Sequence, residues 1–171
     1  MVESIQGLVQ LDEMIYSLRN YIVSVNTGQW GYIFDIIKSF RHERKHLVPM
    51  PARNDLSMYT NYMQAYAKRI IHVAHKRGIL ALGGVPTHIP RKGQTDITQI
   101  ALKRVKADIF RDAKLGYDGS WVAHPGLVKT ASQVYNSIIR NNYNQKEVMA
   151  DDHPRDVDCD LVDVLDFSMT L

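Results

Sequence analysis

The chain has 171 residues, 45% hydrophobic and 23% charged, a composition typical of a globular protein with one sizeable core. No apolar run approaches the ~20 residues that a membrane-spanning helix needs, and the first residues lack the pattern of a secretory signal. The single cysteine, Cys159, excludes an internal disulfide framework and indicates a reducing compartment. We therefore expect an intracellular protein that does not bind a membrane.

The net charge of +3 is unevenly distributed. From Asp151 onward the chain carries seven aspartates and one arginine, a net charge of −6, so residues 1–150 carry +9. A basic body attracts phosphate-bearing ligands, although a solvated basic surface explains most of these side chains. The basic residues are not interleaved with exposed aromatics and no nucleic-acid-binding motif is present, so we expect no nucleic-acid partner.

The first half of the chain predicts two strands and two helical segments. Residues 2–3 read as the end of a strand, and residues 8–18 place apolar side chains at helical spacing. Residues 21–25 are apolar and β-branched, which predicts a strand buried on both faces. Gly28 ends that strand. The following helix is expected to turn one apolar face inward, formed by Trp30, Ile33, Phe34, Ile37 and Phe40.

The second half alternates helices and strands. Ser57 is a plausible N-cap for a helix that ends at Gly78, with an inward stripe of Tyr59, Tyr62, Met63, Tyr66, Ile70 and Val73. A strand at 79–82, a helix at 96–115, a short strand at 121–123 and a helix at 127–140 follow. This alternation indicates βα units with a parallel sheet. The fold class we predict is α/β, a partial TIM (βα)8 barrel with roughly half of the eight strands and helices outside.

The stretch V-N-T-G-Q-W-G-Y-I-F, residues 25–34, is the strongest ligand-site candidate. It reads as a strand end, a glycine turn and the first turn of a helix, whose free N–H groups bind carboxylates and phosphates. Gly28 and Gly31 allow a ligand to approach the backbone closely. A strand–helix turn without a ligand explains the same pattern equally well.

Other chemistry-bearing residues each have a structural alternative. Glu3, at the end of the first strand, would point into a barrel mouth where divalent metals bind, but glutamates near a terminus are commonly solvated. Trp121 would wall a pocket, although a core tryptophan is the commoner case. His124 follows a strand end and is a candidate neighbour of a site. We interpret His72 and His75 as surface histidines.

Six pieces of sequence, taken in order, resemble the malate synthase family. They are E-S-I-Q-G-L-V-Q-L-D-E-M-I-Y-S-L-R (3–19), V-N-T-G-Q-W-G-Y-I-F (25–34), H-K-R-G-I-L-A-L-G-G (75–84), V-K-A-D (105–108), Y-D-G-S-W-V-A-H-P-G-L (117–127) and Q-K-E-V-M (145–149). The resemblance covers residues 1–149 and implies a partial TIM-barrel domain there. Residues 150–171 do not resemble the family's C-terminal domain, and we expect them to form a divergent, poorly ordered acidic tail.

The resemblance implies an acyltransferase of the glyoxylate cycle. The family condenses acetyl-CoA with glyoxylate in a Claisen reaction and hydrolyses the thioester to malate and CoA. Mg²⁺, held by one Glu and one Asp, polarises glyoxylate. An Asp from a C-terminal domain removes the methyl proton, and an Arg from an early barrel segment stabilises the developing charge. Both are expected outside this chain, so the resemblance assigns no catalytic residue within it.

At the metal site, the resemblance carries over only in part. Glu3 matches the metal-binding glutamate. Gly31 falls where the family has its metal-binding aspartate, so one magnesium ligand is replaced. Asp35, one helical turn later, is not an obvious substitute. We therefore expect a weakened Mg²⁺ site.

The substrate-binding positions carry over more completely. Gly28, Gln29 and Trp30 match the turn whose N–H groups hold the glyoxylate carboxylate. Trp121 and Pro125 match the segment that walls the acetyl-CoA channel. The small-molecule partners implied are therefore glyoxylate and acetyl-CoA.

These observations predict a malate synthase-like chain that is catalytically impaired. The alternative is a non-catalytic barrel remnant that binds a partner chain or CoA. Half a barrel has unpaired sheet edges and an uncovered inner face, which favours self-association. The location expected is the peroxisome or glyoxysome, or the cytoplasm. The last three residues, 169–171, do not match the peroxisomal address.

Overall fold

The computed structural model describes residues 1–42, 57–90, 93 and 95–149. A parallel sheet in the order β1-β2-β3 is at its centre. The strands are β1 (Ser24–Asn26), β2 (Leu80–Gly83) and β3 (Gly119–Ser120). Val2 forms a further parallel bridge to Thr27, beside β1, which confirms the predicted strand end at the start of the chain. The architecture is the predicted α/β arrangement of a partial (βα)8 barrel.

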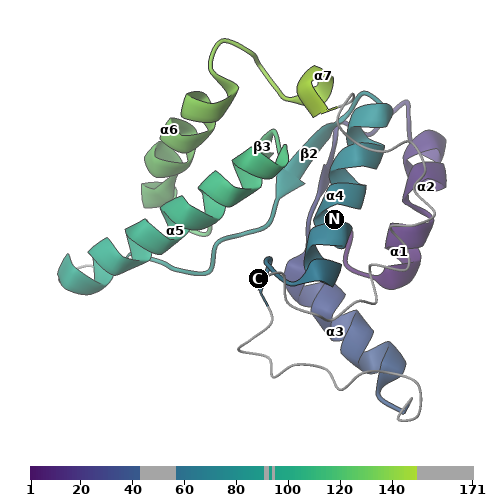
Figure 1. The fold of residues 1–171 in the computed structure, drawn as a ribbon, viewed down its shortest axis with the longest axis horizontal. Helices are drawn as coiled ribbons and strands as arrows, with labels where there is room; N and C mark the ends of the chain where they lie inside the picture. The colour runs from purple at the N-terminus through teal and green to yellow at the C-terminus, as the bar shows by residue number, and fades with distance from the viewer. Residues whose placement is uncertain (43–56, 91–92, 94, 150–171) are drawn as a thin grey trace.

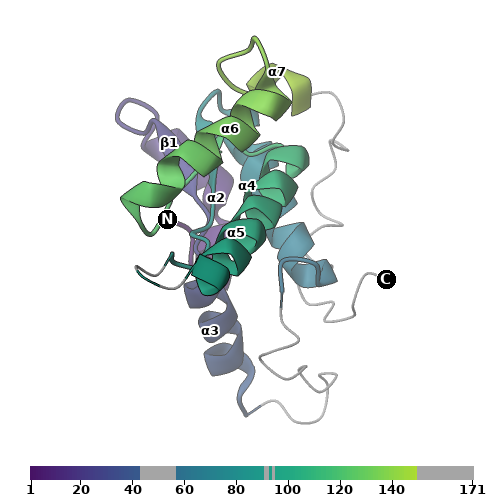
Figure 2. The same ribbon diagram turned by 90° about the vertical axis from the view of Figure 1, so that its left-hand side faces the viewer.

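Helices connect and cover these strands. They are α1 (Ile5–Val9), α2 (Leu11–Ser17), α3 (Gln29–Phe40), α4 (Asn61–Lys76), α5 (Thr95–Leu115), the 3₁₀ turn η2 (Pro125–Leu127), α6 (Val128–Ile139) and α7 (Lys146–Met149). In Figure 1, α4 lies in the middle, with α1 and α2 on one flank and α5 and α6 on the other. Figure 2 shows α3 projecting away from the other helices. Within the described ranges, no helix combines the length and apolarity needed to cross a membrane.

The two faces of the sheet differ in burial. Val25 pairs with Ala81 in register, and both are buried among the helices. Their neighbours on the opposite face, Leu80 and Leu82, are only half-buried. Successive residues of a strand point to opposite faces, so the half-exposed face is the one that a closed barrel would turn inward.

Two predicted strands differ from the structure. Only Ser24 onward pairs with β2, so Tyr21 and Val23 lie before the paired segment and are 85% and 72% exposed. The predicted strand at 121–123 is wrong, because β2 ends at Gly83 opposite Ser120 and offers β3 no further partner. Trp121 lies just beyond that end and is 54% exposed.

The predicted inward faces need correction for two helices. In α3 the buried side chains are Tyr32, Ile33 and Ile36, whereas Trp30, Phe34 and Ile37 are exposed. The buried face turns toward α4, where the Tyr32 ring stacks on Tyr66 with centroids 4.0 Å apart. The α5 helix spans the predicted range and buries Ala101, Val105 and Ile109, but Ile97 and Ile100 in its first turns are exposed.

Helix α4 begins later than predicted. Its N-cap is Thr60, and Ser57 lies in the preceding turn, where its carbonyl accepts bonds from the Thr60 N–H and hydroxyl. Tyr59 is consequently outside the helix and exposed. The end of α4 agrees with the sequence, because Gly78 adopts a positive φ of 73° and donates to the His75 carbonyl.

One buried polar cluster ties α4, β2, β3 and α7 together. His75 Nε2 lies 2.9 Å from Asp118 Oδ2, and their side chains are 1% and 2% exposed, so the expectation of a surface histidine is wrong for His75. The same carboxylate accepts the N–H groups of Ala81 (2.8 Å) and Gln145 (2.6 Å). The Gln145 side chain in turn donates to the Tyr117 carbonyl.

The pKa of Asp118 makes this cluster testable. Burial opposes ionisation, but hydrogen bonds from His75, Gln145 and Ala81 outweigh it and hold the pKa below its usual value. A lowered pKa in the folded state stabilises the fold above the unfolded-state value of about 3.9, and the contribution is lost as the pH falls through the folded-state value.

We therefore expect Asp118→Asn to lower the free energy of unfolding by about 2 kcal/mol at pH 7. The difference from wild type should be constant between pH 7 and 5 and shrink below about pH 4, as measured by urea denaturation. The exposed variant Glu13→Gln is the control and should change stability by less than about 0.5 kcal/mol. A difference that persists undiminished at the lowest pH would contradict this account.

Candidate functional site

The Gly28 turn is fixed by a buried tyrosine. The Tyr66 hydroxyl, on α4, donates to the carbonyl of Val2 and accepts the N–H of Gly28 at 2.9 Å. Burial raises the pKa of Tyr66, so the phenol stays protonated and can serve as donor and acceptor together. Residues 2–3 and the turn that begins α3 are thereby held side by side.

Glu3 lies directly on this turn. A Cβ added to Gly28 would come within 2.2 Å of Glu3 Cγ and 2.7 Å of its Oε1. A Cβ on Gly31 would come within 2.8 Å of Glu3 Cβ and 3.0 Å of Oε1. The structure thus brings together the residues 3, 28 and 31 that the sequence singled out, and a side chain at either turn position would have to displace the Glu3 side chain.

Asp35 has a structural role beside the turn. Its Oδ2 accepts the N–H of Ile5 at 2.9 Å, at the first residue of α1. This bond joins α3 to the segment that follows Glu3. A carboxylate committed to a helix N-terminus in this way is stabilised where it is, since anions are favoured there.

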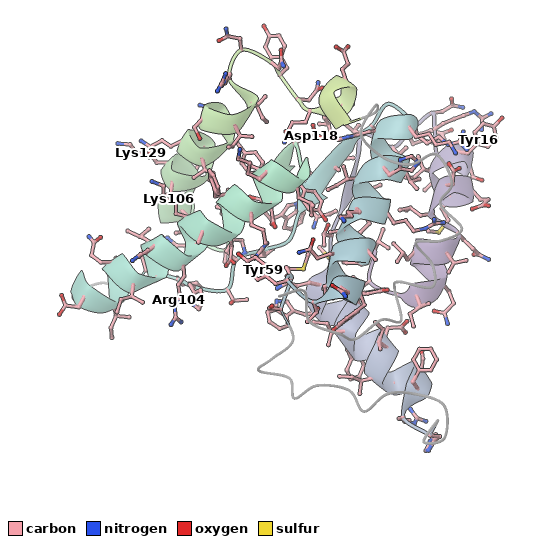
Figure 3. The ribbon with its side chains drawn as sticks, viewed as in Figure 1. Tyr16, Tyr59, Arg104, Lys106, Asp118 and Lys129 are labelled. Atoms are coloured by element: carbon pink, nitrogen blue, oxygen red, sulfur yellow. The ribbon has the colours of Figure 1, made fainter. Side chains whose placement is uncertain are left out.

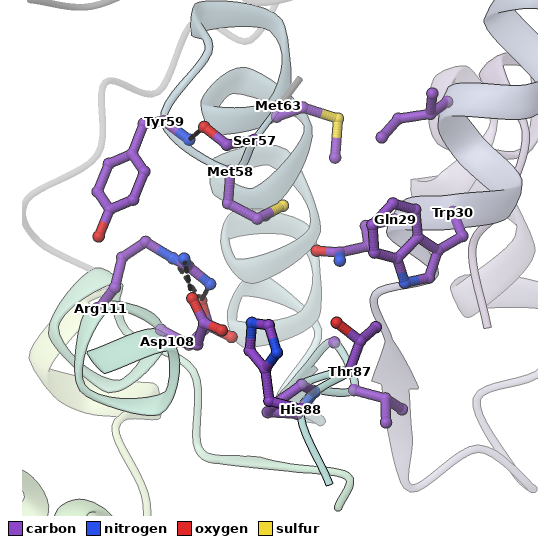
Figure 4. Close-up of a pocket in the computed structure, with 15 residues that line it drawn as sticks. Gln29, Trp30, Ser57, Met58, Tyr59, Met63, Thr87, His88, Asp108 and Arg111 are labelled. Atoms are coloured by element: carbon purple, nitrogen blue, oxygen red, sulfur yellow. Dashed lines mark hydrogen bonds and ion pairs between the residues drawn. The ribbon is translucent and has the colours of Figure 1, made fainter. Parts of the chain in front are cut away.

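A cavity of about 240 Å³ lies beyond the turn, at the carboxyl ends of β1 and β2 (Figure 4). Gln29 and Trp30 approach it from α3, and Thr87 and His88 from the segment after β2. In α/β folds ligands bind at this end of the strands. The apolar part of its lining is Ile33, Met58, Met63, Val85 and Pro86.

The opposite wall of the cavity carries an ion-pair cluster on α5 that sequence reasoning missed. Arg111 donates to Asp112 Oδ1 from Nε and Nη2 (3.0 and 2.9 Å) and to Asp108 Oδ1 from Nη1 (2.8 Å). Burial raises the pKa of Asp112 to about 6, although Arg111 opposes the shift; the charge of Asp108 adds to it. Asp112 also fills the space beside Gly83, where a Cβ would lie 2.8 Å from its Oδ2.

The predicted channel wall is on the surface of the described chain. Trp121 and Pro125 are both exposed, so Trp121 is not a core tryptophan. His124, also exposed, accepts the Gly126 N–H through Nδ1 at 3.0 Å and caps η2. Neither Trp121 nor Pro125 lines the cavity beside Gln29. The structure therefore does not join these two residues to the Gly28 turn.

Exposed basic side chains lie apart from the turn. Arg104 and Lys106 on α5 and Lys129 on α6 occupy the helix pair that faces away from α4 (Figure 3). Asp118, which precedes β3, and Tyr59, which precedes α4, are labelled at separate places in the same view, and Asp118 is not among the residues that line the cavity.

Comparison with known proteins decides the family. A model of the malate synthase TIM barrel domain matches residues 1–165. Malate synthase A of Escherichia coli (strain K12) is 39% identical over 149 residues, 87% of this chain and 27% of the relative. Glyoxysomal malate synthase of Gossypium hirsutum is 35% identical over 153 residues, which are 90% of this chain and 27% of the relative. Malate synthase of Streptomyces clavuligerus is 36% identical over 147 residues, which are 86% of this chain and 27% of the relative. The chain belongs to the malate synthase family.

The chain corresponds to only part of the relatives that it matches. This chain spans about a quarter of the length of the relatives, 27% of each. The match continues to residue 165, beyond the predicted domain end at 149, and that boundary stays a prediction. The predicted tail at 150–171 lies outside the described residues.

The residues around the Gly28 turn offer a magnesium ion a single carboxylate, that of Glu3. Glu3 is the carboxylate lying on the turn, Gly31 supplies none, and Asp35 is bound to the start of α1. Across the described ranges, no three or more His, Cys, Asp or Glu side chains gather in a metal-binding group. Mg²⁺ prefers octahedral oxygen coordination with one or two protein carboxylates. A chelating pair of carboxylates is not present here.

The pKa of Asp112 gives a test of the cavity wall. A carboxyl group whose pKa is raised on folding stabilises the folded state below the unfolded value of about 3.9, and this contribution is lost as the pH rises through about 6. We expect the stability of the wild type to fall by about 2–3 kcal/mol relative to Asp112→Asn between pH 4 and 7.

Carbon-13 NMR titration of the Asp112 carboxyl should show a midpoint near 6. Asp108→Asn should lower that midpoint because it removes a negative neighbour, and Arg111→Gln should raise it because it removes the stabilising cation. A midpoint near 4 that neither variant moves would show that Asp112 is solvated.

Proposed function

We propose that this chain is a malate synthase-like domain that keeps the glyoxylate-binding turn of its family but lacks a competent metal site. The observation that carries the proposal is the contact of Glu3 with Gly28 and Gly31 at the start of α3. Together with the family match, it supports glyoxylate as the ligand of the turn and acetyl-CoA as the second substrate. The glyoxysomal name of one relative supports a peroxisome-type compartment, with the cytoplasm as the alternative.

The family reaction is the condensation of acetyl-CoA with glyoxylate to give malate and CoA. In this proposal the N–H groups of Gln29 and Trp30 orient the glyoxylate carboxylate, beside the Gly28 N–H that bonds to Tyr66. Trp121 and Pro125 form part of the wall along which the acetyl-CoA arm lies. A bound Mg²⁺ would supply the polarising charge on the aldehyde, and the missing second carboxylate removes that support. In this proposal the turn therefore binds glyoxylate without activating its aldehyde.

Malate formation tests this proposal directly. We expect the purified chain, supplied with acetyl-CoA, glyoxylate and magnesium, to release no CoA above the background rate in a thiol-detection assay. Turnover that depends on both substrates and on magnesium would overturn the assignment of an incompetent site. A full-length bacterial relative serves as the positive control for the assay.

The metal defect can be tested at position 31. Gly31→Asp adds the second carboxylate, and we expect magnesium to bind at least about fivefold more tightly by calorimetry, because a charge pair ~4 Å apart contributes on the order of 1 kcal/mol even in water. Gly31→Ala is the matched control: it adds the same Cβ against Glu3 without a ligand, so it should give no gain. Equal magnesium affinity in all three proteins would contradict the role given to residue 31.

A second candidate function is a non-catalytic remnant that binds a partner chain or CoA. The half-buried Leu80 and Leu82 favour it, because they lie on the sheet face that a closed barrel would cover, and so does the exposed apolar ring of Trp121 just after β3. Self-association through this face is the form of partner binding that can be measured with this chain alone.

We expect sedimentation velocity to show concentration-dependent association that Trp121→Ser weakens. Tyr143→Ser provides a matched control, since Tyr143 is a fully exposed aromatic residue away from the sheet. A monomer at all concentrations, or equal effects of both variants, would argue against this second function.

A further inference from the structure

The far wall of the cavity beyond the Gly28 turn is acidic. The charged side chains that line the cavity are Asp108, Arg111 and Asp112, with a net charge of −1 when both carboxyl groups are ionised and His88 is neutral. Arg111 is already paired, because Nε and Nη2 donate to Asp112 Oδ1 and Nη1 donates to Asp108 Oδ1. An anion would meet a paired guanidinium and a net negative charge, so this wall favours a cation.

One buried carboxylate oxygen on this wall has no partner. Asp112 is 4% exposed, and its Oδ1 accepts both bonds from Arg111, whereas its Oδ2 accepts no hydrogen bond from the described residues. Oδ2 lies beside Gly83 at the end of β2, in space that a Cβ on residue 83 would enter. A buried acceptor without a donor is costly, and a bound N–H group would remove that cost.

Two further polar side chains are directed into the same space. Gln29 approaches from the first turn of α3 and His88 from the segment after β2, and both point into the cavity that Asp108 faces from α5 (Figure 4). Within the part of the chain that the structure describes, neither Gln29 nor His88 has a side-chain hydrogen bond. The amide oxygen and the imidazole ring add further acceptors for the N–H groups of a ligand.

The remainder of the lining suits an organic ligand better than a metal ion. The apolar side chains that would contact a hydrocarbon stem are Ile33, Met58, Met63, Val85 and Pro86. In the described ranges, no three or more His, Cys, Asp or Glu side chains are grouped to hold a metal. Trp30 lies on the wall opposite Arg111 (Figure 4), and indole rings attract organic cations.

We propose that this cavity binds a small organic cation, a primary ammonium group on a short apolar stem. The ammonium group lies against Asp108 and Asp112 and donates to Asp112 Oδ2, while the stem contacts the apolar side of the cavity. This site is made by side chains, whereas the glyoxylate contacts proposed above are backbone N–H groups of residues 29 and 30. The inference therefore does not rest on the proposed function.

Calorimetry on the full chain with n-butylammonium, 1-butanol and butyrate tests the charge preference. The three probes share one hydrocarbon stem and differ in the charge of the head group. We expect n-butylammonium to bind at least about tenfold more tightly than either of the others, as a hydrogen bond between charged groups does relative to a neutral one.

The carboxylates can be tested one at a time. Asp108→Asn and Asp112→Asn should each weaken n-butylammonium binding by about fivefold, because each removes a negative charge next to the ammonium group. Asp96→Asn is the matched control: Asp96 is an exposed aspartate in the first turn of the same helix and does not line the cavity, so it should have no effect.

The affinity should also depend on pH. Burial raises the pKa of Asp112 to about 6, so n-butylammonium binding should strengthen as the pH rises through this value. The ionisable groups that face Asp112 are Arg111 and Asp108 on α5, Tyr117 before β3 and Tyr135 on α6. Asp112→Asn should abolish the pH dependence, and His88→Gln, which removes the imidazole from the cavity, should retain it.

Three results would overturn the proposal: no binding of n-butylammonium, equal or tighter binding of butyrate or 1-butanol, or an affinity that both Asn variants leave unchanged. Helical circular dichroism of the variants shows whether they are folded, and if one is not, the comparison of the three probes and the pH profile of the wild type decide. A chain that binds n-butylammonium but not glyoxylate would support this inference and remove the proposed ligand of the turn.

Discussion

The arrangement of the candidate site depends on one buried hydroxyl. Tyr66 is on α4, yet its oxygen bonds the backbone of both Val2 and Gly28, which are far apart in sequence from it and from each other. Its ring also stacks on Tyr32 of α3. These contacts align the first segment of the chain with the start of α3, and Glu3 meets Gly28 and Gly31 as a consequence. The Val2–Thr27 bridge and the hydrogen bond from Ile5 N–H to Asp35 hold the same two segments together.

Local sequence patterns predicted most of the helices and strands, but not which of their apolar side chains are buried. Gly78 ends α4 as its backbone freedom suggested, and α5 spans nearly the predicted range. The errors concern apolar residues near strand and helix ends, such as Val23 and Trp121. Periodicity reports which residues are apolar, but their burial depends on a neighbouring element being present. In a sheet with three strands, several of these neighbours are not among the described residues.

Sequence patterns likewise identified part of the candidate site and missed the rest. Glu3, Gly28 and Gly31 were identified from motif resemblance, and the structure brings them into contact. The clusters around Asp112 and Asp118 were missed, because no local pattern distinguishes a buried aspartate from a solvated one. His75 and Asp118 are 43 residues apart, and the packing of α4 against β2, which pairs with β3, brings them together. Such pairs follow from tertiary structure and cannot be read from spacing.

The parallel sheet has a consequence for how the chain reaches this structure. Val25 pairs with Ala81 and Leu82 with Gly119, so each pairing closes a long stretch of chain that contains at least one helix. The entropy of closing these loops is lost before the strand pairs are gained, which slows folding compared with a helical bundle of the same size. The connection between β1 and β2 contains α3 and α4, and that between β2 and β3 contains α5, so each strand pair depends on contacts made by residues far apart in the sequence.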